Sequence, residues 1–218
     1  MKIMWYGHSA FQVATEDGVR IIIDPYESGA FGGSVGYGKI KDEADIVLIS
    51  HNHEDHNCTK DIQGKFTQID KAGQYKEKGV EINAISTFHD KVQGKERGAN
   101  LIFVISAEDM RVAHLGDLGH TPDRSVLEHM GKIDILLLPV GGFFTIDAKE
   151  ATEIMNMLKP AITIPMHYKT EKADFPIESL AAFTGDKQNV KELKTSDLRV
   201  TKTTLPATSE IVIPRHAL

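Results

Sequence analysis

Residues 46–56 read IVLISHNHEDH, and no other stretch of the chain is so dense in metal-binding side chains. The segment Ile46–Ser50 is apolar and rich in β-branched residues, which predicts a buried strand. The six residues that follow it hold three histidines and one aspartate: His51, His53, Asp55 and His56. Imidazole and carboxylate are common protein ligands of Zn²⁺ and similar ions. The stretch therefore predicts a strand that delivers metal ligands at its end.

The composition is that of an ordinary folded protein. The chain has 218 residues, of which 41% are hydrophobic and 26% charged, so we expect one domain spanning residues 1–218. The single cysteine, Cys58, excludes a disulfide within the chain. We find no signal-peptide pattern at the start and no apolar run of the ~18 residues that a membrane span needs. These features favour a cytoplasmic protein that does not associate with membranes.

The net charge of −6 argues against an extended surface for binding nucleic-acid phosphates. We therefore expect a small-molecule substrate as the partner and no nucleic acid. Homo-oligomer formation is left open, because no residue pattern decides it.

The pattern of apolar residues predicts a layered α/β architecture, with strands first and then strands alternating with helices. Residues 147–158 show helical spacing, with Asp147 as N-cap. Residues 27–38 contain five glycines and predict a loop that faces substrate or is disordered. Residues 141–145 follow a core strand and are expected to line a pocket. The remaining predicted strands cover residues 2–6, 10–14, 19–23, 65–69, 80–86, 100–106, 110–115, 133–140, 161–166 and two segments of 197–213; the remaining predicted helices cover 58–63, 123–130 and 176–184.

Ligand-type residues recur at the ends of four predicted strands. After the cluster that follows residue 50, His89 follows strand 80–86, Asp117 follows strand 110–115, and His167 follows strand 161–166. If these strands lie side by side, seven side chains converge on one rim: His51, His53, Asp55, His56, His89, Asp117 and His167. Seven ligands are too many for one tetrahedral ion but suit two ions that share a carboxylate. Two such ions hold a bridging hydroxide and polarise a substrate oxygen, which is the arrangement of a binuclear hydrolase.

The spacing His51-x-His53-x-Asp55-His56 resembles the H-x-H-x-D-H signature of the metallo-β-lactamase fold superfamily. Asp24 at the end of an early strand comes before this signature, as in that family. His89, Asp117 and His167 follow it in the family's order. The resemblance covers nearly the whole chain and implies a four-layer αββα sandwich with the site on one edge.

One branch of the superfamily is similar in further detail. It contains the ascorbate-phosphate lactonase, N-acyl phosphatidylethanolamine phospholipase D and many prokaryotic metal-dependent hydrolases, and the chain looks most like the last group. The similar segments are residues 5–9 (WYGHS), 23–25 (IDP), 50–53 (SHNH), 115–120 (LGDLGH) and 164–168 (IPMHY).

The resemblance also implies roles for individual residues. His51, His53 and His89 would hold the first metal ion. The second ion would be held by Asp55, His56 and His167. Asp117 would bridge the two ions, and Asp55 would also accept or donate a proton. Asp24 would orient a ligand imidazole, as metal sites usually require. The expected ions are two divalent cations, with Zn²⁺ first and Mn²⁺, Fe²⁺ or Ni²⁺ as alternatives.

Some assignments have alternatives. His114 competes with His89 for the place of the family histidine that follows the H-x-H-x-D-H signature. We favour His89, because it lies in a loop after a strand, whereas His114 lies three residues before Asp117 within a strand and so faces the opposite side. His8 and His120 lie where rim residues contact substrate or shuttle a proton, but packing roles explain them equally well.

The predicted function is hydrolysis of an ester, lactone or phosphoester of a small molecule by a metal-bridging hydroxide. One alternative is a nucleic-acid phosphodiesterase on the same fold. A di-iron oxidoreductase is a weaker alternative, because relatives of that kind carry glutamate at the position of His53.

Overall fold

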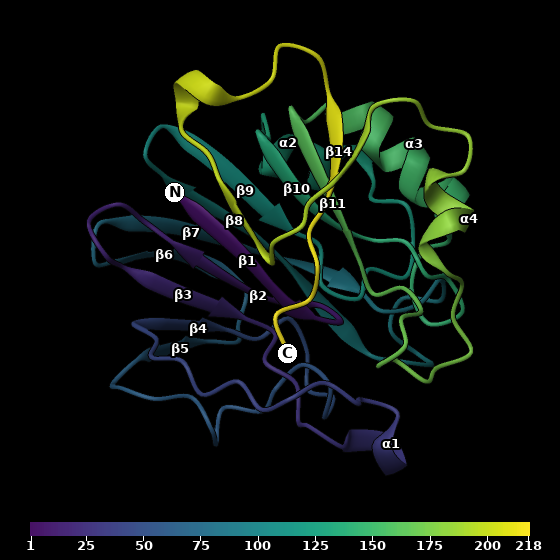
Figure 1. Cartoon of the computed structure of the whole chain (residues 1–218), viewed down its shortest axis with the longest axis horizontal. Coiled ribbons are helices and arrows are strands. Elements are labelled where there is room, and N and C mark those ends of the chain that lie inside the picture. The colour runs from purple at the N-terminus through teal and green to yellow at the C-terminus, as the bar shows by residue number, and fades with distance from the viewer.

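Two β-sheets face each other, and helices cover one of the outer faces (Figure 1). The computed structural model describes residues 1–218. The first sheet has six strands in the order β13 (Asp197–Arg199), β1 (Lys2–Gly7), β2 (Ala10–Ala14), β3 (Arg20–Ile23), β4 (Ile46–Leu48) and β5 (Thr67–Ile69). The second sheet has eight strands in the order β12 (Val190–Glu192), β14 (Glu210–Ile213), β11 (Ile162–Met166), β10 (Ile135–Pro139), β9 (Met110–His114), β8 (Ala99–Ala107), β7 (Val80–Phe88) and β6 (Gly73–Glu77).

Both faces of the first sheet are buried, which explains why its central strands are apolar throughout. Along β3, Ile21 and Ile23 point into the main core, which lies between the sheets and continues under the helices. The residue between them, Ile22, points to the other face and belongs to a second apolar cluster. Side chains of a strand alternate between its faces, so a strand buried on both sides has no polar positions.

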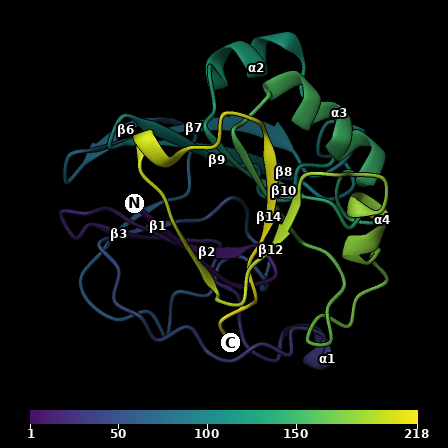
Figure 2. The ribbon, with the colours of Figure 1, turned by 45° about the horizontal axis from the view of Figure 1, so that its top comes forward.

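Three helices pack on the outer face of the second sheet, as Figure 2 shows. They are α2 (Arg124–Met130), α3 (Ala148–Leu158) and α4 (Leu180–Thr184). Asp147 is the N-cap of α3 and forms a capping box with Glu150. The outer face of the first sheet is covered by loops and the single turn α1 (Ala30–Gly33), so the outer layer there is thin. The predicted α/β sandwich is confirmed.

Several predicted elements are wrong or incomplete. Residues 58–63 form turns rather than a helix, because the backbone N–H of Cys58 donates to Pro25 O at 2.7 Å and holds the segment against the sheet. Of the predicted helix 176–184, only Leu180–Thr184 is helical and forms α4. Strands β6 and β12 were not predicted, because both are short edge strands with mainly polar residues and lack an apolar alternation.

The strand directions bring several strand ends to one end of the sandwich. In the first sheet, β1 and β3 are each antiparallel to β2, and β4 is parallel to β3. In the second sheet, β7 and β9 are each antiparallel to β8, while β10 runs parallel to both β9 and β11. The carboxyl ends of β1, β3 and β4 therefore share one edge of their sheet, and those of β7, β9, β10 and β11 share one edge of theirs. We call the place where these two edges meet the rim.

The opposite end of the sandwich is held by ion pairs of Asp45. Its carboxylate accepts from Lys78 Nζ at 2.6 Å, and so connects the start of β4 with the turn between β6 and β7 of the other sheet. The backbone N–H of Arg20 donates to the same carboxylate at 2.8 Å. Lys78 lowers the pKa of Asp45 to about 2, against the opposing effect of burial, and Arg20 contributes further.

We predict that Asp45→Asn lowers the free energy of unfolding by about 1–2 kcal/mol at neutral pH. Because the pKa of Asp45 is lower in the folded chain than in the unfolded chain, this contribution is present above the ordinary pKa. It should decline as the pH falls from about 5 toward about 2. Urea unfolding at several pH values measures it. The control is Glu81→Gln, whose partner Lys76 is exposed, and it should change little. An Asp45→Asn effect that does not vary with pH would contradict this account.

Candidate metal centre

Asp24 organises the loop that follows β4. It lies fully buried directly after β3. Its two carboxylate oxygens accept from the backbone N–H of Ser50 at 2.7 Å and from Ser50 Oγ at 2.6 Å. A third donor is His56 Nδ1, at 3.0 Å. One carboxylate thus holds both ends of the loop that carries the H-x-H-x-D-H residues.

These hydrogen bonds decide which ring nitrogen is presented at the rim. Since Ser50 Oγ donates to Asp24, it accepts from His51 Nδ1, at 2.9 Å. His56 likewise uses Nδ1–H to donate to Asp24. Both rings therefore direct Nε2 inward, and neither Nε2 atom has a hydrogen-bond partner. A donor on one ring nitrogen and a free lone pair on the other is the usual state of a metal-binding histidine.

Asp117 is placed by Asn100, which reaches it from β8. The backbone N–H of Asp117 donates to Asn100 Oδ1 at 2.9 Å, and Asn100 Nδ2 donates to Leu115 O at 3.0 Å. Gly116 makes this approach possible: a Cβ at Gly116 would lie 2.3 Å from Asn100 Oδ1, and its φ of +55° is left-handed. The turn after β9 is therefore tied to β8, and the Asp117 side chain points into the rim.

Four histidine rings surround a single oxygen of Asp117. The Oδ2 atom lies 3.2 Å from Nε2 of His167, 3.3 Å from Nε2 of His56, 3.3 Å from Nε2 of His89 and 3.9 Å from Nε2 of His51. The other oxygen, Oδ1, is buried and has no hydrogen-bond partner.

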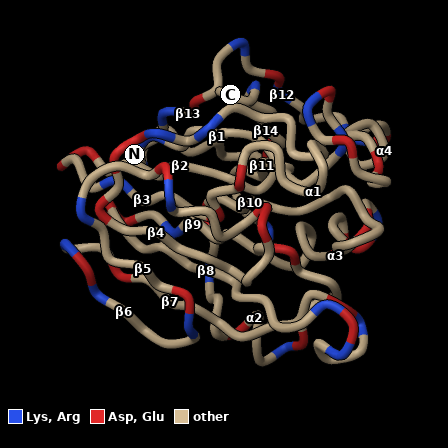
Figure 3. Tube along the Cα trace, turned by 90° about the horizontal axis from the view of Figure 1, so that it is seen from below, with Lys and Arg blue, Asp and Glu red and all other residues tan.

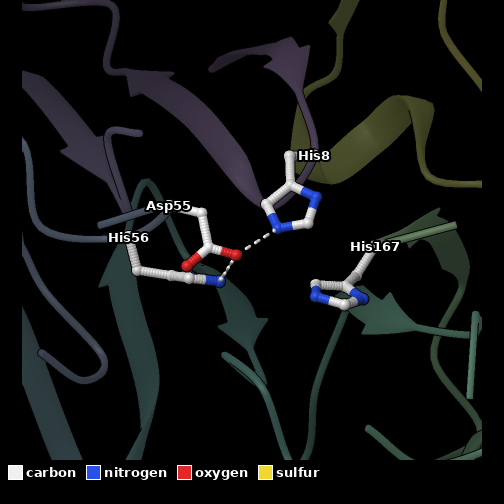
Figure 4. Close-up of side chains that lie close together, drawn as sticks. All are labelled: His8, Asp55, His56 and His167. Atoms are coloured by element: carbon white, nitrogen blue, oxygen red, sulfur yellow. Dashed lines mark hydrogen bonds and ion pairs between the residues drawn. The ribbon is translucent and has the colours of Figure 1, made fainter. Parts of the chain in front are cut away.

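Two groups of candidate ligands are joined by a third, which comprises His51, His56 and Asp117. Of the two, one comprises His51, His53 and His89. The other comprises His8, Asp55, His56 and His167, and is drawn in Figure 4. Within each group the ligand atoms all lie within 4.8 Å of one another. The structure thus brings together all seven side chains that the sequence pointed to, and adds His8.

His8 contacts a candidate ligand and does not line the pocket. Its Nε2 lies 3.0 Å from Asp55 Oδ2, as the dashed line in Figure 4 marks. Its carbonyl oxygen accepts from Trp5 Nε1 at 3.0 Å and from the backbone N–H of His167 at 3.2 Å. His8 therefore fixes the orientation of Asp55 and the position of His167.

His89 and His114, the two candidates for the histidine that follows the H-x-H-x-D-H signature, lie in different surroundings. His89 reaches Asp117, as described above. His114 is buried between the sheets, with Nε2 donating to Ser9 O at 2.8 Å and Nδ1 accepting from the backbone N–H of Gly116 at 3.0 Å. Both nitrogens of His114 are thus occupied. His120 stays outside the cluster: Nδ1 donates to Thr121 O, and the ring packs near Phe88.

The pKa shifts show how strongly the charges at the rim interact. Burial disfavours a charge on His56, but Asp117 and Asp55 outweigh it and raise its pKa well above the usual value. Burial, reinforced by His56, lowers the pKa of His51 to about 3. The pKa of Asp55 is lowered: burial opposes ionisation, but His56 and His8 prevail. A cation bound among these residues would compete with protons for the same ring nitrogen atoms.

The residues fit a metal centre. Imidazole nitrogens with carboxylate oxygens form a donor set that suits Zn²⁺ and related ions. Three atoms of this cluster, His51 Nε2, His56 Nε2 and Asp117 Oδ1, are among the buried side-chain atoms that have no hydrogen-bond partner. Buried polar atoms in folded proteins usually have partners, so such a group needs an explanation, and a cation supplies one.

A pocket of about 410 Å³ opens over the cluster. Five of its lining residues are candidate ligands: His53, Asp55, His89, Asp117 and His167. Phe31 and Ser34 of the glycine-rich loop line it, as does Phe144 from residues 141–145, so both segments expected to face a pocket do so. The sequence did not point to the other lining residues, Glu96, Arg97, Asp174, Phe175 and Pro176. They lie in irregular loops that carry no recognisable motif.

Comparison with known proteins shows to which family the chain belongs. The family described as "Beta-lactamase superfamily domain" matches residues 2–167. A solved structure of a proposed Zn-dependent hydrolase of the metallo-β-lactamase superfamily, from Thermotoga maritima, is 33% identical, covers 97% of each chain and superposes with a TM-score of 0.82. The chain belongs to the metallo-β-lactamase superfamily. This confirms the family that the sequence pattern resembles.

Archaeal members of the superfamily are also similar. A UPF0173 protein from Pyrococcus abyssi is 34% identical over 78% of this chain and 84% of its own length. A UPF0173 metal-dependent hydrolase from Methanopyrus kandleri is 31% identical over 78% of this chain and 85% of its own length.

None of the helices is long and apolar enough to cross a membrane.

We predict that Asp24→Ala weakens metal binding by about 10–100-fold, because His51 and His56 lose the network that orients them. The affinity is measured by competition with a chelator. The matched control is Asp134→Ala. Asp134 is also buried and accepts from a backbone N–H, that of Arg111, and from Lys202, but it lies away from the rim.

Both variants should lower the free energy of unfolding, since each leaves buried donors without partners. Only Asp24→Ala should lower the metal affinity. Equal losses of affinity in the two variants would mean that the effect comes from general destabilisation.

Proposed function

We propose that the chain is a binuclear metal-dependent hydrolase that cleaves an ester, lactone or phosphoester of a small molecule. The observation that supports this most directly is the single Asp117 oxygen with four histidine Nε2 atoms around it. A carboxylate that faces two groups of ligands is suited to be shared by two cations. His51, His53 and His89 would hold one ion, and Asp55, His56 and His167 the other.

Zn²⁺ is the first choice for both ions because the donor set is rich in imidazole, and Mn²⁺, Fe²⁺ or Ni²⁺ could use the same donors. Two divalent ions would lower the pKa of water and polarise the substrate oxygen, which makes hydrolysis feasible without a serine or cysteine nucleophile.

Asp55 is the residue best placed to handle the proton. It lines the pocket, where its carboxylate can accept a proton from the attacking water. It would then return that proton to the leaving-group oxygen. His8, which donates to Asp55 Oδ2, keeps the carboxylate directed toward the pocket.

The pocket and the charge distribution favour a small substrate over a nucleic acid. Figure 3 shows Lys and Arg interspersed with Asp and Glu along the trace rather than gathered in one segment. The only cationic side chain that lines the pocket is Arg97, beside Glu96 and Asp174. Binding of a polymer of phosphates depends on several cationic contacts. Relatives from Methanopyrus kandleri and Thermoplasma acidophilum are named metal-dependent hydrolases, which agrees with the proposed class of reaction.

We predict that the number of metal ions bound by variants distinguishes the two groups of ligands. The wild-type chain should bind two ions. His53→Ala should weaken only one of them, because His53 belongs to only one group. Asp117→Ala should weaken both, because it is shared. Both variants should lose hydrolytic activity by at least about 10²-fold. Elemental analysis after dialysis, with titration against a chelator, gives the stoichiometry.

His129→Ala is the control, since this exposed histidine lies on α2 and donates to Ser125 O. It should keep both ions and full activity. A wild-type chain that binds a single ion at saturation would exclude the binuclear proposal. Full activity in Asp117→Ala would exclude metal-dependent hydrolysis at this site.

A further inference from the structure

Three phenylalanine rings, those of Phe31, Phe144 and Phe175, form a wall of the pocket. Phe175 stands in the middle: its centroid lies 5.9 Å from that of Phe31 and 6.1 Å from that of Phe144, both edge-on. Phe175 also lies against the ring of His8, at 5.5 Å. The wall therefore lies beside the group that holds Asp55. Phe31, at one end of the wall, is 49% exposed although apolar.

The three loops that carry these rings are fastened together by main-chain hydrogen bonds. Gly36 N donates to Lys172 O at 2.7 Å, and Asp174 N donates to Ser34 O at 2.9 Å, which pairs the Phe31 loop with the Phe175 loop. Glu178 N donates to Gly141 O at 2.7 Å, which ties the Phe175 loop to the Phe144 loop. The wall is thus preformed, as ligand pockets usually are.

Charge is scarce on this wall. The only charged lining residues besides the candidate ligands are Glu96, Arg97 and Asp174, one cation against two anions. The guanidinium of Arg97 lies over the Phe144 ring, 5.3 Å from its centroid. For a phosphate placed against this wall, the only cationic lining residue would be Arg97, which is already stacked on an aromatic ring. The wall therefore does not suit a second anionic group on the substrate.

We propose that the substrate is an uncharged ester with an apolar acyl chain or aryl ring on the acyl side, rather than a sugar phosphate. This rests on the hydrolase function proposed above. The apolar group would lie against Phe31, Phe144 and Phe175, with the ester carbonyl over Asp117. Water adds to the carbonyl carbon and the acyl C–O bond breaks. The products are a carboxylate and an alcohol: one proton of the water goes to the leaving oxygen, and the other is released to solvent.

The size of the pocket also favours a small molecule. A volume of about 410 Å³ lies toward the lower end of the ~300–1,000 Å³ of typical small-molecule sites. It offers room for a short or medium chain next to the scissile bond.

The test is a chain-length series of p-nitrophenyl esters, from acetate through butyrate to octanoate, with the Zn²⁺-loaded wild-type chain. Each methylene that is buried on the wall should raise kcat/KM by about fourfold, until the pocket is full. Glucose 6-phosphate and bis(p-nitrophenyl) phosphate are the phosphate-bearing probes. Binding of octanoate and of glucose 6-phosphate, followed by calorimetry, gives a readout that does not depend on turnover.

Phe175→Ala should flatten the chain-length dependence and weaken octanoate binding by about 10-fold or more. The control is Met157→Ala on α3. Met157 is an apolar side chain that is 45% exposed and does not line the pocket, so the dependence should stay as in the wild-type chain. Phe175→Leu keeps an apolar side chain and should restore most of the preference, which separates loss of the wall from misfolding.

The outcomes separate the two proposals. Ester hydrolysis that is independent of chain length, or Phe175→Ala behaving like Met157→Ala, overturns the apolar-substrate proposal and leaves the hydrolase intact. Preference for the phosphate-bearing probes does the same. If the metal-loaded chain hydrolyses neither esters, lactones nor phosphoesters, the proposed function fails and this inference fails with it.

Discussion

The Asp117 carboxylate in a buried ring of histidines is the constraint on which the rest of the site depends. Imidazole lone pairs and a carboxylate oxygen repel one another when they are crowded together, unless cations or protons lie between them. In this chain the partners behind the rings hold them in place: Asp24 behind His56 and, through Ser50, behind His51. Asn100 does the same for Asp117. Much of the polar network in the core therefore serves to aim lone pairs at one point.

The topology makes this convergence possible. Each sheet contributes strands that end at the rim, and each ligand follows its strand by only a few residues, so the rigid sheets position the side chains. The apolar clusters on both faces of the first sheet keep β3 and β4 fixed, and with them Asp24 and the loop that begins at Ser50. In a site built in this way, the ligands lie close to the rigid strands and have little freedom to move. We infer that substrate choice is left to the outer loops, where Phe31, Phe144 and Phe175 lie.

Much of this could be predicted from the sequence, for physical reasons. Long strands that are buried on both faces are continuous apolar runs, and ligands directly after them form a recognisable pattern. The helix starting at Asp147 had both an N-cap and apolar spacing. Short polar edge strands such as β6 have neither signal. Asn100 and Phe175 were not predicted because they act through contacts between segments far apart in the sequence. His8 could be placed near the rim, but its contact with Asp55 depends on how the two loops pack.

The central claim is that the Asp117 carboxylate is shared between two ions. Anomalous diffraction from crystals of the Zn²⁺-loaded chain tests it most directly. Two anomalous peaks about 3.5–4 Å apart, both bound to Asp117, are the expected result. One of them should lie against His51, His53 and His89, and the other against Asp55, His56 and His167. A single peak, or two peaks of which only one contacts Asp117, would contradict the account.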